Sequence, residues 1–390
     1  MMKRRELFQV MAGLALAGTR GIHGQTRRVV VAGGGIMGSA IALRLAQPGA
    51  HVTLIEKGQP GGGATANSFA WINSTFSKQP RAYFDLNRLG ILVWRQTDRE
   101  LDGALQVQWG GSIEWYADEA NAKELAEQVR AHQAWGYGVR LIDGATLRAL
   151  EPKLNPGILV RASHADEEGN VDPVHATQTL LASARAAGAT VMTGTAITGL
   201  DRPSGRLRAV QTAAGSVEAD VLVVACGVDT PKVAAMAGLD VPLQDSPGLL
   251  AHTKPLPRLI NRVTLAPNAH MKQKADGRMV VGEGFGGSAT DKASLEEGRR
   301  ALSVAKGFLP DLDVDAIDRV TLGWRPLPKD GFPIVGFSPR APDIYLAVMH
   351  SGITLSPFIG KAAAVEILDG VELDALRPYR LSRFGASSQG

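Results

Sequence analysis

Residues 28–56 read RVVVAGGGIMGSAIALRLAQPGAHVTLIE and form the most informative segment of this chain. The pattern predicts a buried strand over residues 29–32, a glycine turn, a helix over residues 39–46 and a strand over residues 51–55 that ends in an acid. Gly33, Gly35 and Gly38 occupy the positions of G-x-G-x-x-G, where glycine permits a sharp turn, close approach to a pyrophosphate and tight helix packing. The segment therefore predicts a dinucleotide-binding βαβ unit.

The predicted helix N-terminus would lie against the phosphates, because its backbone N–H groups and its dipole attract negative charge. Ile36 and Met37 lie within this turn and are expected cofactor contacts. Glu56 would accept hydrogen bonds from the ribose hydroxyl groups, and its neighbour Lys57 is a further expected contact. The alternative is a glycine-rich strand–helix turn that binds no nucleotide.

The composition is that of a globular protein. A chain of 390 residues suggests two or three domains or one large α/β unit. Hydrophobic residues make up 45% of the chain and charged residues 21%, which is enough apolar sequence for a large core. The net charge is +4, of which Lys3, Arg4, Arg5 and Glu6 contribute +2, so nucleic-acid binding is not expected. The single cysteine, Cys226, excludes an intrachain disulfide and says nothing of the compartment.

The first residues predict export. Three basic residues precede a short apolar run, residues 10–17, which is too short to span a bilayer but fits a signal sequence with a small-residue cleavage site. Residues 4–8, RRELF, resemble the twin-arginine export motif. We therefore expect residues 1–25 to be a signal segment and the protein to be periplasmic or otherwise exported by this route, which moves folded proteins with their cofactor. The alternative is an ordinary basic tail.

The rest of the chain alternates helical and strand patterns. Helices are predicted over residues 81–101, 120–135, 144–150 and 173–187, from Ser294 to about 308, and from Gly352 to about 368. Strands are predicted over residues 107–116, 220–225, 264–282 and 344–348, and a meander of four short strands over residues 190–218. We find no repeats and no linkers.

Five segments in this order resemble the D-amino-acid oxidase, glycine oxidase and sarcosine oxidase family of FAD-dependent amine oxidoreductases. The first two are GGGIMG with Glu56, and GGGATANS at residues 61–68. The next two are residues 171–191, VDPVHATQTLLASARAAGATV, and residues 219–227, ADVLVVACG. The last is GWRPLPKDGFPIVG at residues 323–336 with HSGITLSP at residues 350–357. The G-x-R-P-x-x-x-D-G-x-P element is the most specific, because it is not a general nucleotide motif.

The resemblance implies an α/β fold with a Rossmann-like FAD-binding domain and an inserted mixed-sheet substrate domain. The FAD-binding domain would comprise residues 27–105, 150–230 and 320–390, and the substrate domain residues 106–149 and 231–319. Ala64 and Thr65 would contact the FAD pyrophosphate, Ile197 would present its backbone to the adenine or be only a core residue, and Gly227 would allow close packing beside the cofactor. The N–H groups of Gly352, Ile353 and Thr354 would stabilise negative charge on the flavin.

Arg325 is the expected substrate anchor, because a guanidinium group binds a carboxylate through two parallel hydrogen bonds and stays charged. The alternative is a structural arginine that connects strands. His350 would either shape substrate binding or be a loop histidine. Family members have tyrosines in the substrate domain, whereas the corresponding stretch here has His270 and Met271, which argues against a simple α-amino acid. No histidine lies in residues 67–75, and Cys226 is on a different segment, so FAD is expected to be non-covalent.

The expected reaction is oxidation of a C–N bond in a small amine or amino acid, with hydride transfer to the flavin. The alternatives are an FAD-dependent hydroxy-acid dehydrogenase and a non-catalytic FAD-binding assembly protein. The sequence does not distinguish oxygen, a quinone or a cytochrome as the electron acceptor. No metal-binding motif and no transmembrane span are expected.

Overall fold

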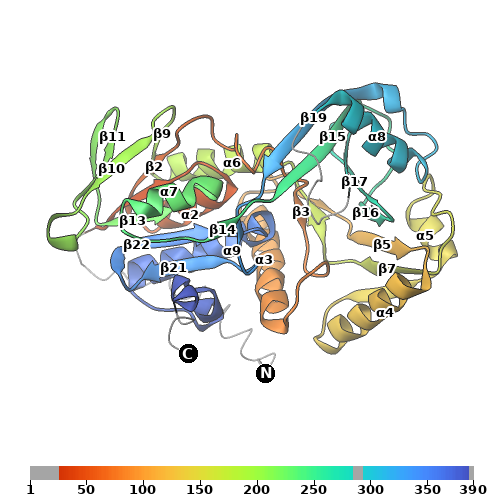
Figure 1. Cartoon of the computed structure of the whole chain (residues 1–390), viewed down its shortest axis with the longest axis horizontal. Helices are drawn as coiled ribbons and strands as arrows, with labels where there is room; N and C mark the ends of the chain where they lie inside the picture. Colours follow the sequence, from red (N-terminus) through yellow and green to blue (C-terminus); the bar gives the residue numbers. More distant parts are fainter. Residues whose placement is uncertain (1–25, 284–292, 386–390) are drawn as a thin grey trace. The chain divides into compact units, whose positions relative to one another are not determined.

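The structure is a computed structural model of the chain, and it describes residues 26–283 and 293–385 (Figure 1). The expected signal segment, residues 1–25, lies outside the described residues. The chain forms two compact units. Unit 1 consists of Met1–Gly63, Val174–Gln244 and Pro326–Gly390, and unit 2 of Ala64–Pro173 and Asp245–Arg325.

Unit 1 is built on a six-stranded sheet with the order β21-β22-β13-β1-β2-β9 (Figure 1). Its central strand, β1 (Arg28–Ala32), pairs in parallel with β13 (Val221–Val224) and with β2 (His51–Ile55). These strands are continuous apolar runs because both faces of a parallel sheet are covered. The other strands are β22 (Ala341–Val348), β9 (Thr190–Met192) and the antiparallel edge strand β21 (Ile334–Ser338).

One strand of the predicted meander belongs to this sheet instead. β9 pairs in parallel with β2, with Leu54 opposite Val191. The antiparallel meander therefore has three strands, β10 (Ile197–Asp201), β11 (Ala209–Thr212) and β12 (Gly215–Glu218). The prediction failed here because the four strands within residues 190–218 are all short. Only the strand with which each one pairs distinguishes the parallel strand β9 from the strands of the meander.

Two helices of unit 1 approach each other at backbone contact. Helix α2 (Ile36–Ala46) begins three residues before the predicted start at Ser39, because the apolar Ile36 and Met37 are buried in its first turn. Helix α9 (Gly352–Ala364) packs against it, and a Cβ atom added at Gly360 would lie 2.8 Å from the carbonyl oxygen of Ala40. Beyond α9 the chain continues as a π-helical turn, Val365–Asp369.

Unit 2 is built on an eight-stranded sheet with the order β19-β15-β18-β17-β16-β5-β7-β6. Its neighbours are antiparallel except for the parallel pair of β16 and β5, so the sheet is mixed, as expected from the sequence. The strands are β19 (Ile317–Trp324), β15 (Pro247–Pro255), β18 (Arg278–Gly282), β17 (Ala269–Gln273), β16 (Val263–Ala266), β5 (Ser112–Tyr116), β7 (Arg161–Ala165) and β6 (Val139–Ile142).

Helix α8 (Leu295–Lys306) packs on this sheet through Ala301, Leu302 and Ala305, which share a core with Trp115. Helix α4 (Glu119–Ala134) lies along β6 and β7. The remaining elements are α3 (Arg81–Glu100), α5 (Gly144–Leu150), α6 (Pro173–Ala186), α7 (Thr230–Ala235), the paired strands β14 (Leu243–Gln244) and β20 (Leu327–Pro328), and β3 (Trp71–Ile72), β8 (Gly169–Asn170) and β4 (Gln108–Trp109).

The unit boundaries differ from the predicted domain boundaries, which placed residues 64–105 with the FAD-binding domain. Helix α3 lies in this stretch and contacts other segments of unit 2. Phe84 stacks on His132 with 5.0 Å between ring centroids, and Arg95 donates a hydrogen bond to the carbonyl oxygen of Glu167. These contacts are non-local, so the helical pattern of α3 does not reveal them.

The α/β fold with a Rossmann-like unit and a mixed-sheet unit is confirmed. Among the described residues, no helix is both long and apolar enough to span a membrane.

We expect Gly360→Ala to destabilise the protein, because the carbonyl of Ala40 is backbone and cannot move aside as a side chain would. The free energy of unfolding should fall by about 1–3 kcal/mol, despite the higher helix propensity of alanine. Gly199→Ala is the matched control in unit 1, since a Cβ atom there would lie 3.8 Å from Gln211. Urea unfolding of both variants measures the difference, and equal stabilities would contradict backbone contact between α2 and α9.

Candidate functional site

The predicted cofactor residues of unit 1 meet at one edge of its sheet. β22, β13, β1 and β2 run in parallel, so the residues that follow them lie at the same edge. Gly33 follows β1, Glu56 follows β2, Gly227 comes shortly after β13 and Gly352 shortly after β22. The structure thus brings together residues that are more than 300 positions apart, at the edge where α/β sheets bind their ligands.

The glycine turn accepts no larger residue at two positions. Gly33 has φ +101°, and a Cβ atom there would lie 2.4 Å from the carbonyl oxygen of Ala225. A Cβ atom at Gly38 would lie 1.9 Å from the carbonyl oxygen of Gly33. Gly35 is the N-cap of α2, and no side chain caps this helix. The helix N-terminus is therefore suited to a bound phosphate.

Glu56 belongs to this turn. Its Oε2 accepts a hydrogen bond from the N–H group of Gly34 at 2.7 Å, and its Oε1 accepts one from Gly58 at 2.7 Å. A carboxylate oxygen accepts two hydrogen bonds, so each oxygen keeps a lone pair for a ribose hydroxyl group. The N–H group of Thr195 donates to the carbonyl oxygen of Glu56, which brings the segment before Ile197 to this position.

The segment after β13 also lies at this edge. Gly227 has φ +57°, which favours glycine, and a Cβ atom added to it would meet no atom of the described chain within 4 Å, so its predicted packing beside the cofactor stays a prediction. Lys57 forms an ion pair with Asp229, with 2.5 Å between Nζ and Oδ2, and this hydrogen bond raises the pKa of Lys57. Burial raises the pKa of the Cys226 thiol to about 12.

At the start of α9, one of the backbone amides predicted to contact the flavin has a hydrogen-bond partner within the chain. The N–H group of Gly352 donates to the carbonyl oxygen of His350 at 2.8 Å, and His350 itself is exposed. The Gly352 amide thus has a hydrogen-bond partner within the chain, and its flavin contact stays a prediction. Ile353 is half-buried and Thr354 is buried in the first turn of the helix, and both stay predicted contacts.

The other predicted site residues belong to unit 2. Ala64 and the buried Thr65 lie in a turn closed by the N–H group of Ser68, which donates to the carbonyl oxygen of Thr65 at 3.2 Å. Arg325 is half-buried just after β19. Its Nε donates to the carbonyl oxygen of Ser246 at 3.3 Å, so one edge of the guanidinium group contacts the start of β15. Burial lowers the pKa of Arg325, but an arginine remains charged at any physiological pH.

His270 and Lys272 lie on the same face of β17, two residues apart, and both pack on Phe69. The His270 ring meets the Phe69 ring edge to face, with 4.6 Å between centroids. Burial, with a smaller contribution from the charge of Arg325, lowers the pKa of His270 to about 3, so this imidazole is neutral. His270 is thus a neutral group near the predicted substrate anchor.

Lys272 is a feature that the sequence analysis missed. Its side chain is fully buried, its Nζ donates to the carbonyl oxygen of Val171 at 2.8 Å, and it lies 5.7 Å from the centre of the Phe69 ring. Burial lowers its pKa to about 7, although Asp172 opposes the shift. The sequence of β17 does not reveal the buried lysine, because all five residues of this strand are buried and exposed and buried positions do not alternate along it.

The same network continues into the loop that follows Thr65. The N–H group of Val171 donates to the carbonyl oxygen of Ala70 at 3.2 Å, and Ala70 has φ +56° although it is not a glycine. Such a backbone conformation persists only where surrounding contacts impose it, and it is frequent at functional sites. In the described part of the chain, no group of three or more His, Cys, Asp or Glu side chains is placed to hold a metal ion.

The buried Lys272 should make stability depend on pH. Between pH 7 and pH 10.5 the unfolded chain holds a proton that the folded chain releases, so the free energy of unfolding should rise with pH. The slope is at most about 1.4 kcal/mol per pH unit for one proton. Lys272→Met should remove this contribution, and the exposed Lys123→Met is the control. Urea unfolding at several pH values measures it, and parallel curves for wild type and Lys272→Met would contradict the prediction.

Comparison with known proteins agrees with this geometry. A family model described as DAO, FAD dependent oxidoreductase, matches residues 28–365. Glycine oxidase of Bacillus licheniformis is 26% identical over 363 residues, which cover 91% of this chain and 96% of that protein. The L-proline dehydrogenase structure from P. horikoshii has a TM-score of 0.83 at 24% identity and covers 93% of this chain and 98% of its own.

A second solved structure, glycine oxidase from Geobacillus kaustophilus, also has a TM-score of 0.83, at 22% identity, with 92% of this chain and 99% of that chain covered. At these identities the two structures show the same fold. The family model spans most of this chain, including the glycine turn and the segment around Arg325. The chain therefore belongs to the DAO family of FAD-dependent oxidoreductases, as its sequence resemblance predicted.

Proposed function

We propose that this FAD-dependent oxidoreductase oxidises the C–N bond of an amine or amino acid that has a carboxylate, and that Arg325 binds this carboxylate. The supporting observation is the half-buried guanidinium group of Arg325, which contacts backbone carbonyls along one edge near a neutral histidine. A guanidinium group removed from water binds a carboxylate strongly and in a defined orientation. The relatives named glycine oxidase and L-proline dehydrogenase support an amino-acid-like substrate.

We infer that the carboxyl edge of the unit 1 sheet holds the FAD. The crowded glycines and the uncapped start of α2 suit the pyrophosphate, and the Glu56 oxygens suit the ribose. When bound, FAD supplies the acceptor for a hydride. The proposed contacts in unit 1 are Gly33, Gly35, Ile36, Met37, Gly38, Glu56, Lys57, Ile197, Gly227, Ile353 and Thr354. Those of Ala64, Thr65 and Gly352 stay predictions.

The flavin is proposed to be non-covalent. Cys226 lies at this edge, directly before Gly227, but the thiolate form is the nucleophile of cysteine chemistry. Because burial holds the pKa of Cys226 near 12, the thiol stays protonated at physiological pH. The cysteine therefore packs as a small apolar side chain and is not an attachment site.

The chain's own contribution to the reaction is orientation and charge. Arg325 would fix the substrate through two hydrogen bonds to its carboxylate and so set the position of the neighbouring carbon. Since His270 is neutral, Arg325 is the charged member of this pair of residues and the one that would bind the carboxylate. The amino group must be unprotonated when its carbon loses a hydride, and we assign no side chain as the base. His270 and Met271 lie where the family resemblance leads us to expect tyrosines, which favours a substrate other than a simple α-amino acid.

Replacement of Arg325 tests this function. Arg325→Ala leaves the substrate carboxylate without its partner, which costs about 2–5 kcal/mol, so flavin reduction should become about 30-fold slower or require correspondingly more substrate. Arg325→Lys keeps the charge without the two-pronged geometry and should give an intermediate loss. Arg319→Ala, an exposed position on β19, is the control.

The measurement is anaerobic stopped-flow reduction of the bound flavin by a panel of amines and amino acids, with FAD content measured in each variant. Unchanged kinetics in Arg325→Ala would show that this arginine is structural. Loss of FAD or of folding would also favour the structural alternative. If 2-hydroxy acids reduce the flavin and amines do not, the hydroxy-acid alternative replaces the proposed reaction.

We also propose that the protein is exported in folded form through the twin-arginine pathway. The support is the sequence of residues 3–17, in which a pair of arginines precedes a short apolar run. Replacement of both Arg4 and Arg5 by lysine should leave a folded, FAD-containing precursor in the cytoplasm. Cell fractionation with detection of the protein measures this, and a variant that still reaches the periplasm would exclude this route.

A further inference from the structure

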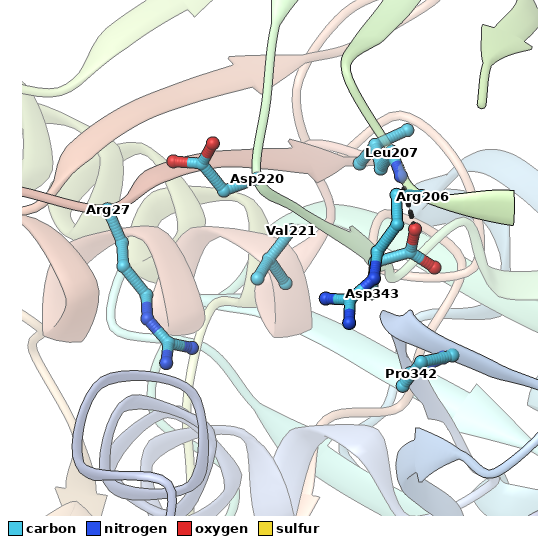
Figure 2. Close-up of a pocket in the computed structure, with 7 residues that line it drawn as sticks. All are labelled: Arg27, Arg206, Leu207, Asp220, Val221, Pro342 and Asp343. Atoms are coloured by element: carbon cyan, nitrogen blue, oxygen red, sulfur yellow. Dashed lines mark hydrogen bonds between the residues drawn. The ribbon is translucent and has the colours of Figure 1, made fainter. Parts of the chain in front are cut away.

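A hollow of about 370 Å³ lies at the opposite edge of the unit 1 sheet from the glycine turn. It is found where β1, β13 and β22 begin, whereas the proposed FAD contacts follow the ends of these strands. Its lining residues are Arg27, Arg206, Leu207, Asp220, Val221, Pro342 and Asp343 (Figure 2). The hollow is therefore separate from the proposed cofactor edge.

Both acidic residues of the hollow are already satisfied by other groups. Asp220 accepts hydrogen bonds from the guanidinium group and the backbone N–H of Arg28, which lower the pKa of Asp220. Asp343 accepts one from Nη2 of Arg202 at 2.7 Å and another from the N–H group of Leu207. The hydrogen bonds of both carboxylates thus come from residues other than Arg27 and Arg206.

Neither of those two arginines forms a hydrogen bond or ion pair with a carboxylate of the described residues, although the charge of Arg27 adds to the effect of Arg28 in lowering the pKa of Asp220. Arg206 is exposed, and its guanidinium group makes no hydrogen bond or ion pair with a described residue. Arg27 donates from Nη1 to the carbonyl oxygen of Ile367, which leaves its other donors available. Together with the residues that pair with the lining, this region contains more guanidinium groups than carboxylates. The four guanidinium groups are those of Arg27, Arg28, Arg202 and Arg206, and the three carboxylates are those of Glu218, Asp220 and Asp343.

The arrangement of these groups suggests the shape of a ligand. The guanidinium ends of Arg27 and Arg206 lie on opposite sides of the hollow, and Val221 lies between them (Figure 2). Leu207 and Pro342 add further apolar surface. A guanidinium group pairs with a carboxylate through two hydrogen bonds, and an apolar wall suits a short hydrocarbon chain. We propose that this hollow binds a small aliphatic dicarboxylate, with one carboxylate at each arginine and the methylene groups over Val221.

The experiment measures binding of glutarate to the FAD-loaded protein by calorimetry at low ionic strength. One glutarate should bind per chain, and Arg206→Gln or Arg27→Gln should each weaken binding about tenfold or more, the loss of one charge-assisted pair. Arg340→Gln, an exposed arginine of unit 1 outside the hollow, should bind as wild type does. Butyrate has one carboxylate and should bind about tenfold more weakly than glutarate.

Binding at Arg325 has to be separated from binding in the hollow. Glutarate affinity should survive in Arg325→Ala, and its loss there would place the ligand at the proposed substrate anchor and overturn the proposal. The proposal is also overturned if Arg206→Gln and Arg27→Gln both bind as wild type does, or if butyrate binds as tightly as glutarate. If phosphate binds more tightly than glutarate, the ligand of the hollow is a compact oxyanion and not a dicarboxylate. Retained FAD and an unchanged Tm in the variants show that folding is intact.

Discussion

The approach of Gly38 to the carbonyl group of Gly33 is the constraint on which the cofactor edge depends. A Cβ atom at Gly38 would lie 1.9 Å from that oxygen, so helix α2 can start directly after β1 only if this residue is glycine. The position of α2 then fixes two further features. Glu56 can accept a hydrogen bond from Gly34 in the turn, and α9 can pack against α2 at Gly360. A single short contact thereby connects the phosphate position, the ribose acceptor and the C-terminal helix.

Local signals of the sequence were sufficient for most elements of this fold. β2 and α5 begin and end at the predicted residues, and α3 differs by one residue at its end, because apolar periodicity and glycine or proline at the boundaries determine them. The meeting of Gly33, Glu56 and Gly227 at one edge was also predictable, since parallel strands place their following residues together. The resemblance to a known family, which the family model bears out, supplied the cofactor.

Other features depend on contacts between distant segments and were not accessible in this way. β9 has only three residues, and their sequence does not show whether the strand pairs in parallel with β2 or belongs to the meander. The hydrogen bond from Gly352 to His350 depends on the turn between β22 and α9, which the pattern HSGIT does not specify. Lys272 was overlooked because lysine is rarely buried, and its burial follows only from the packing of Phe69 and Val171 around β17.

The division of the chain into alternating segments has a consequence for its synthesis. The chain passes between the two units after Gly63, Pro173, Gln244 and Arg325, and β22 and α9 lie in the last segment. While the ribosome makes the second segment of unit 2, Asp245–Arg325, β13 has no neighbour on one side, because β22 does not yet exist. An unpaired strand edge of this kind is open to wrong pairing until translation ends. Unit 1 can therefore be completed only after β22 and α9 have been made, and the edge of β13 stays open until then.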